Sequence, residues 1–191
     1  MVLAMLVALT VWMQAGGVAF ESDLWPEEGI PVFEAVATQL SLHELPSASS
    51  KVIRRLTVKA KQRLVFDETR YRTMTPGRLT ALVSATIKGR MLGDVTRLSK
   101  ADYYSDTFPE ASVDVSAGDI VEYLQYRAEG TCFVRVAGKT IDAAPCPTHT
   151  KAFRLDVKPS LEWWVQITVN SKPAGWLLVT DTTVRVIDRK G

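Results

Sequence analysis

The chain has 191 residues, of which 47% are hydrophobic and 23% charged, values that suit an ordinary globular protein with a buried core. The net charge is only +2, so the charge balance alone indicates no partner. The bases are unevenly placed, because none precedes Lys51 and 23 bases then accompany 15 acids. This excess of bases from Lys51 onward favours binding to an anionic envelope surface or polymer. The alternative is an ordinary solvated surface, of which acids interspersed with bases are typical.

The chain opens with an apolar run, from Val2 to Phe20, that only Thr10 and Gln14 interrupt. Gly17 to Ala19 places small residues at the two positions that a signal peptidase requires. We therefore predict a signal peptide over residues 1–19 and an exported protein, periplasmic or extracellular, with no membrane span after cleavage. An uncleaved anchor is the alternative, because the run approaches the roughly 20 residues that a span needs.

The next hundred residues contain few strong signals. Residues 20–41 are predicted to be a linker with one short element, since two prolines and a glycine interrupt Leu24 to Pro31 and the pattern of Val32 to Leu42 suits a helix or a strand. Lys51 to Phe66 alternates in polarity and predicts two strands joined near Lys59 to Lys61. Leu79 to Ile87 is a further strand candidate, and residues 88–118 are rich in loop residues.

Strand signals become clear after Gly118. Cys132 to Val136 alternates, a turn follows at Ala137 to Lys139, and Thr140 to Ala143 returns, which predicts a hairpin. Cys132 and Cys146 are the only cysteines, and in an exported chain such a pair predicts one disulfide that closes this hairpin. Neither His43 nor His149 lies at a metal-ligand spacing from them, so no metal site is predicted.

Short β-rich segments continue to the end of the chain. They are Ile120 to Tyr126, Phe153 to Val157, Trp163 to Val169, Gly175 to Val179 and Thr183 to Ile187. Short strands at regular spacing predict an all-β protein built as a small barrel or sandwich.

Four of these segments resemble the successive strands of the bacterial SH3-like (SH3b) domain. The matching stretches are Gly118 to Leu124, Glu162 to Ile167 with its Trp-Trp pair, Gly175 to Val179 with its Gly-Trp pair, and Val184 to Ile187. Leu42 to Phe66 resembles the opening half of the same family. The resemblance implies a tandem pair of small SH3-like barrels: a divergent first domain over 42–100, and a second over 101–191 in which residues 125–161 insert the disulfide-bonded hairpin.

The resemblance also suggests where a ligand would bind. Tyr103 and Tyr104 lie where SH3-like domains carry aromatic residues on the loop that lines their groove; local packing is the alternative. Trp163 and Trp164 must face opposite sides of a strand, so one is expected in the barrel core and the other partly exposed or covered by the insertion. The ligand-binding candidates are Tyr103, Tyr104, Trp163 and Trp176.

No catalytic motif is recognisable: the sequence contains neither a Gly-x-Ser-x-Gly nor a His-Glu-x-x-His pattern. We expect a non-enzymatic, cofactor-free binding protein whose partner is a cell-wall ligand or an envelope protein. The basic stretch Lys51 to Arg72 favours an anionic wall polymer, a lipid headgroup or an acidic protein face over nucleic acid in an exported chain. The alternatives are a structural subunit of an envelope assembly and a small exported hydrolase that uses a Cys132–His149 pair.

Overall fold

The structure, a computed structural model, describes residues 17–25, 29–105 and 107–187. The predicted signal peptide lies outside the described residues except for residues 17–19. Strands make up 57% of the described residues and helices 4%, which confirms the all-β prediction. Within the described part of the chain, no helix is long and apolar enough to cross a membrane.

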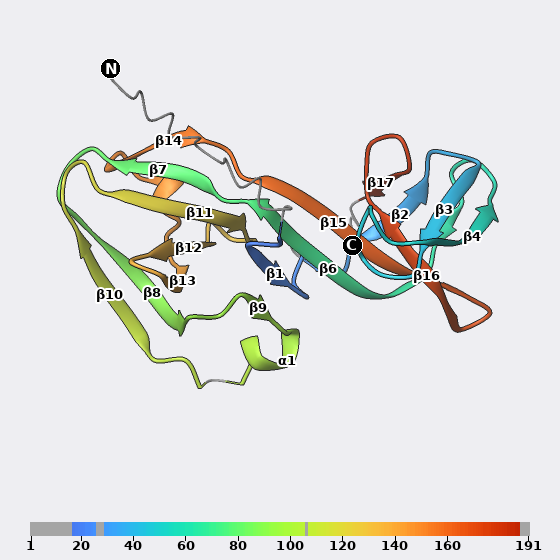
Figure 1. Cartoon of the computed structure of the whole chain (residues 1–191), viewed down its shortest axis with the longest axis horizontal. Helices are drawn as coiled ribbons and strands as arrows, with labels where there is room; N and C mark the ends of the chain where they lie inside the picture. Colours follow the sequence, from blue (N-terminus) through green and yellow to red (C-terminus); the bar gives the residue numbers. More distant parts are fainter. Residues whose placement is uncertain (1–16, 26–28, 106, 188–191) are drawn as a thin grey trace, which may run out of the picture.

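Most strands belong to two seven-stranded sheets that lie towards opposite ends of the molecule (Figure 1). Sheet A contains, in order, β4 (Val52–Thr57), β3 (Gln39–His43), β16 (Lys172–Leu178), β15 (Ser160–Val169), β6 (Phe66–Thr75), β1 (Phe20–Ser22) and β9 (Arg97–Leu98). Sheet C contains β10 (Glu110–Val115), β8 (Ala85–Gly93), β13 (Lys139–Ala143), β12 (Cys132–Val136), β11 (Ile120–Tyr126), β7 (Gly77–Ala81) and β14 (Phe153–Val157).

The remaining elements are short. A three-stranded sheet B contains β17 (Val184–Ile187), β2 (Val32–Ala35) and β5 (Arg63–Leu64). The helices are α1 (Lys100–Tyr103) and the 3-10 turn η1 (Pro147–His149).

A two-stranded ribbon joins the two large sheets. β6 continues into β7 through Pro76, and β14 continues into β15 through Lys158 and Pro159. Proline cannot donate to a strand ladder, so the pairing is interrupted where the strands change sheet. Gly77 is needed at this point, because a Cβ there would lie 2.6 Å from the Val157 carbonyl oxygen. The ribbon thus carries the chain between the ends of the molecule (Figure 1).

Three apolar clusters form the core. The first fills sheet C and includes both cysteines. The second joins sheets A and B and is aromatic, with the rings of Phe33 and Trp163 centred 5.2 Å apart. The third lies where β1 meets β12 and contains Phe20, Phe133 and Tyr103.

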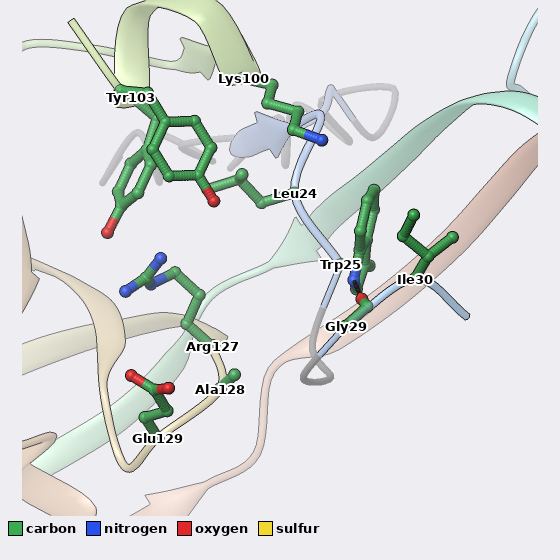
Figure 2. A pocket seen from close by; sticks show the side chains of 10 residues that line it. Leu24, Trp25, Gly29, Ile30, Lys100, Tyr103, Arg127, Ala128 and Glu129 are labelled. Atoms are coloured by element: carbon green, nitrogen blue, oxygen red, sulfur yellow. Dashed lines mark hydrogen bonds between the residues drawn. The ribbon is translucent and has the colours of Figure 1, made fainter. Parts of the chain in front are cut away.

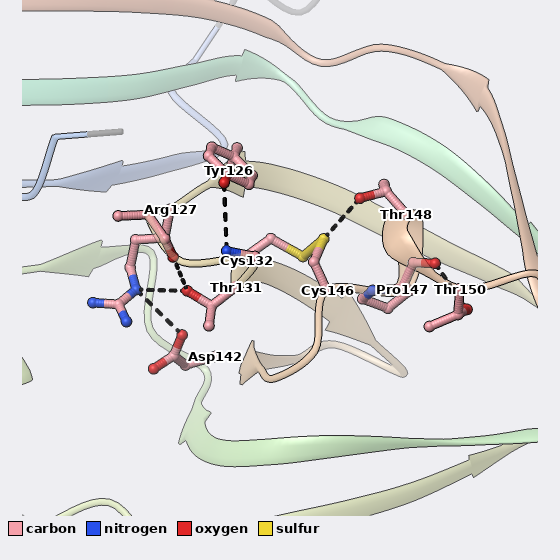
Figure 3. The surroundings of a disulfide bond; sticks show 11 residues. Tyr126, Arg127, Thr131, Cys132, Asp142, Cys146, Pro147, Thr148 and Thr150 are labelled. Carbon is pink, nitrogen blue, oxygen red and sulfur yellow. Dashed lines mark hydrogen bonds and ion pairs between the residues drawn. A yellow bond between two sulfur atoms is a disulfide. The ribbon is translucent and has the colours of Figure 1, made fainter. Parts of the chain in front are cut away.

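The predicted disulfide hairpin is confirmed. β12 and β13 pair through Val136 and Lys139 across a two-residue turn, in which both Ala137 and Gly138 have positive φ. The Cα atoms of Cys132 and Cys146 lie 5.1 Å apart, and the two residues form the disulfide shown in Figure 3. The hairpin is not an insertion into a separate barrel, as we expected, because β12 and β13 occupy the middle of sheet C.

The predicted barrel of the last four strands is wrong. β11 lies in sheet C, β15 and β16 are neighbours in sheet A, and β17 pairs with β2 in sheet B. Neither large sheet closes on itself among the described strands. The physical reason is that the apolar residues of these strands enter different cores: Val121 packs in the cluster of sheet C, whereas Val184 packs beside Phe33.

The sheets do not follow the predicted division into domains over 42–100 and 101–191. Sheet A pairs Tyr71 with Trp163, and sheet C pairs Leu79 with Val121, so each joins strands from both sides of that boundary. The segment 20–41, predicted to be mostly linker, supplies β1, β2 and the start of β3. The stretch Val32 to Leu42, undecided from its pattern, forms strands.

Candidate functional site

A cleft of about 500 Å³ opens beside the third apolar cluster (Figure 2). Three segments form its walls: the chain that follows β1, the helix α1 and the turn that follows β11. The lining residues are Leu24, Trp25, Gly29, Ile30, Lys100, Tyr103, Tyr104, Arg127, Ala128 and Glu129. These segments are far apart in the sequence, so the cleft exists only in the folded chain.

One wall of the cleft is an aromatic ring with a cation beside it. The Lys100 ammonium lies 4.9 Å from the centre of the Trp25 ring, a cation–π distance. Ser99 caps α1 by accepting a hydrogen bond from the Asp102 amide at 3.0 Å, which holds Lys100 at the start of the helix. The Trp25 indole in turn donates to the Gly29 carbonyl oxygen. Hydrogen bonds within the neighbouring chain therefore position both Trp25 and Lys100.

The same pair borders a second cavity of about 490 Å³. The two cavities share Trp25, Ile30 and Lys100, and the second continues to Phe66 and Arg70 on β6. The lining of the two cavities carries aromatic rings and charges of both signs.

A partly buried charge cluster lies behind the walls formed by α1 and by the turn after β11. Asp142 is only 6% exposed and accepts a hydrogen bond from the Tyr103 hydroxyl at 2.9 Å. Arg90 Nη2 lies 3.0 Å from Asp142 Oδ2, and Arg127 Nε lies 3.6 Å from Oδ1. Both guanidinium groups also lie over the Tyr103 ring, at 4.2 and 4.5 Å from its centre. Two arginines thus share one carboxylate, and the cluster keeps an excess of positive charge.

Tyr103 holds this cluster together as a neutral phenol. Burial, reinforced by the negative charge of Asp142, raises the pKa of Tyr103 to about 12. The hydroxyl is therefore protonated at neutral pH and donates to the carboxylate.

Arg127 is the member of the cluster that lines the cleft. Its Nε donates to the Thr131 hydroxyl at 3.2 Å and faces Asp142, as Figure 3 shows. Neither of its Nη atoms donates a hydrogen bond to a described residue. A guanidinium group presents paired N–H donors that match a carboxylate, so the free end of Arg127 has the geometry for an acidic ligand group.

The structure separates the four residues predicted to bind a ligand. Tyr103 and Tyr104 both line the cleft, with ring centres 5.0 Å apart, but Tyr103 is buried and Tyr104 is 63% exposed. Trp163 and Trp176 are buried in sheet A, where Trp176 packs under the Arg70 guanidinium group. The two tryptophans therefore do not join the tyrosine pair in one groove.

Trp163 and Trp164 lie on opposite faces of β15, yet both are buried. Trp163 packs against Phe33 in the core between sheets A and B. Trp164 is fully buried against His43, with ring centres 5.3 Å apart, and its indole donates to Glu162 at 2.9 Å. The expectation of a partly exposed tryptophan is therefore wrong, and Trp164 shares its face of sheet A with His43 of the early strand β3.

The catalytic alternative has no free thiol. Cys132 is bonded to Cys146, and His149 packs beside the Tyr126 ring at 6.1 Å. No group of three or more His, Cys, Asp or Glu side chains in the described part of the chain is arranged to hold a metal ion.

Trp25, Lys100, Arg127 and Asp142 were not identified as site residues from the sequence. Trp25 lies in a segment whose prolines and glycine predict only a linker. Asp142 lies within the predicted hairpin, and Arg127 lies shortly before it. The one usable signal was a large aromatic residue in a polar, proline-rich segment, which is often a recognition element.

Comparisons of the chain with protein-family models, with curated proteins and with solved structures found no match. The resemblance to SH3-like domains stays a prediction that rests on the sequence motifs alone.

Proposed function

We propose that this chain is an exported, non-enzymatic binding protein that recognises a cell-envelope ligand in the cleft beside Trp25 and Tyr104. The ligand class that fits best is a cell-wall fragment, peptide or glycan, that carries a carboxylate. The disulfide supports export, because such bonds persist in oxidising compartments.

The observation that carries the proposal is the composition of the cleft. Tyr104 offers an exposed aromatic surface and Trp25 a half-buried one. Lys100 on α1 and Arg127 in the turn after β11 offer cations from two different walls. Aromatic faces bind the apolar side of a sugar or peptide, while a guanidinium group binds its carboxylate. Pockets that combine apolar surface with a few placed polar groups are the usual form of a ligand site.

The test is a titration of the oxidised, exported protein with soluble fragments from a peptidoglycan digest, followed by calorimetry. Lys100→Gln and Tyr104→Ala change exposed side chains, and each is expected to weaken binding about tenfold, the equivalent of one charge-assisted or stacking contact. Arg54→Gln, on the exposed edge strand β4, is the matched control and should bind like the wild type.

The outcomes separate the competing functions. Binding that both cleft variants weaken supports the proposal. Absence of binding to every fragment, or equal binding by Lys100→Gln, contradicts it. A stable self-association in sedimentation experiments with no fragment binding would instead favour the structural-subunit alternative.

A further inference from the structure

The residues around the predicted cleavage point belong to the fold. Ala19 donates its backbone N–H to the Thr73 carbonyl oxygen at 2.8 Å. Its own carbonyl oxygen accepts a hydrogen bond from Arg135 Nη2 at 3.0 Å. Phe20 is fully buried, with its ring centre 5.2 Å from that of Phe133. The structure therefore uses both peptide groups of Ala19.

Cleavage after Ala19 would damage this arrangement. Both backbone hydrogen bonds of Ala19 would leave with the leader. The new α-ammonium would be on Phe20, whose atoms are all buried, at the place where Arg135 now binds the Ala19 carbonyl. A buried ammonium next to a guanidinium group is unfavourable both through desolvation and through repulsion of like charges. Glu122, which pairs with Arg135 at 3.0 Å, already has a cation partner.

The sequence offers one other position with the same small-residue pattern. Ala15 and Gly17 place small side chains three residues and one residue before the bond between Gly17 and Val18. A cut after Ala15 would place Met13 three residues before the broken bond, and a cut after Gly16 would place Gln14 there. A cut after Val18 would place the branched Val18 itself directly before the broken bond. In the folded chain Gly17 is exposed and Val18 is partly exposed, so an ammonium on Val18 would be solvated.

We propose that signal peptidase cuts after Gly17, so that the mature protein begins at Val18 and keeps Ala19 as the first hydrogen-bonded residue of the fold. The inference rests on the proposed export. Water supplies a hydroxyl group to the Gly17 carbonyl carbon, the bond to the Val18 nitrogen breaks, and that nitrogen takes the proton. The cut is made on the extended chain at the membrane, before β1 pairs with β6.

The first test is the N-terminus of the exported protein. The full chain with a C-terminal affinity tag is expressed in a bacterium, purified from the periplasm or the medium, and analysed by intact mass and N-terminal sequencing. A start at Val18 is expected. A start at Phe20 overturns the proposal and leaves export standing. An uncut chain outside the cytoplasm, with its disulfide formed, also overturns the cleavage site and leaves export standing. An uncut chain that stays in the cytoplasm overturns both the cleavage site and the proposed export.

The second test compares purified proteins that begin at Val18 and at Phe20, each released from a fusion partner without extra residues. The Phe20 form is expected to melt about 5–10 °C lower, because it loses two hydrogen bonds and buries a charge. Arg135→Met in both proteins should shrink that difference, since it removes the competing cation. Equal melting temperatures, or a difference that Arg135→Met leaves unchanged, would overturn the physical argument.

Discussion

The two ends of the molecule are stabilised in different ways. Sheet C has a disulfide between residues separated by 14 positions, and its central strands form a tight hairpin. The end built from sheets A and B joins opposite ends of the chain: β2 pairs with β17, and Glu34 binds Arg185 across 151 positions. Sheet C is therefore closed by a local covalent bond in addition to its strand pairing, whereas the other end depends on packing and pairing between distant segments alone.

This difference has a physical consequence. Pairing between distant segments costs loop-closure entropy, so the free energy gained from burying large apolar surfaces must offset that cost. The end without a disulfide accordingly buries Trp163, Trp164, Phe33 and Trp176. Four predictions test whether the two ends depend on these different sources of stability.

Trp164→Ala is expected to have the largest effect, at the end held by packing. The side chain is fully buried against His43, and its loss should lower the free energy of unfolding by about 3–5 kcal/mol. Urea denaturation followed by tryptophan fluorescence and circular dichroism measures it. Tyr104→Ala, which removes a 63% exposed ring, is the control and should change stability little. A wild-type midpoint for Trp164→Ala would show that this end does not depend on aromatic packing.

Removal of the disulfide tests the other end. Replacing Cys132 and Cys146 together with serine should cost about 3 kcal/mol, because the unfolded chain regains the entropy of a loop of that length. Thermal unfolding of the double variant, compared with the oxidised and the reduced wild type, gives the value. Reduced wild type should behave like the variant. If all three proteins melt together, hairpin pairing alone closes sheet C.

Asp142→Asn tests the charge cluster beside the cleft. The asparagine amide would leave the partly buried Arg90 and Arg127 without their shared carboxylate. We expect the free energy of unfolding to fall by about 2 kcal/mol. Asp114→Asn on the edge strand β10, where the carboxylate accepts only from the exposed Thr86 hydroxyl, serves as the control. Equal denaturation midpoints for the two variants would mean that the cluster does not stabilise the fold.

Alkaline pH is expected to lower the free energy of unfolding through tyrosines at both ends of the molecule, whereas pH changes near neutrality should have no such effect. Burial raises the pKa values of Tyr71, Tyr103 and Tyr123 to about 12, above the value of 10.0 for an unfolded tyrosine. Stability is thus complete below pH 10 and is lost as pH rises towards 12, because the unfolded state gives up these protons first. Unfolding midpoints measured across this range should fall. Tyr71→Phe in sheet A and Tyr123→Phe in sheet C should each make the fall shallower, and an unchanged slope in either variant would exclude that tyrosine as a cause.

The local features of this protein could be predicted from its sequence. The class was predictable because strand residues alternate in polarity, and the hairpin was predictable because Gly138 follows Ala137 between two alternating segments. The disulfide followed, since the hairpin register places Ala143 opposite Cys132 and Cys146 lies just past the end of the returning strand. Each of these features depends on residues within about one hairpin of each other, where backbone geometry leaves few choices.

The pairing of distant strands and the position of the cleft depend on the folding of the whole chain. Alternation shows that Val121 and Val184 each have a buried face, but not that they enter different cores. Trp25, Lys100, Arg127 and Asp142 come together from positions up to 117 apart. The physical reason is that alternation specifies which side of a strand is apolar, whereas the choice of partner depends on the shape and area of surfaces that form only when the whole chain has folded.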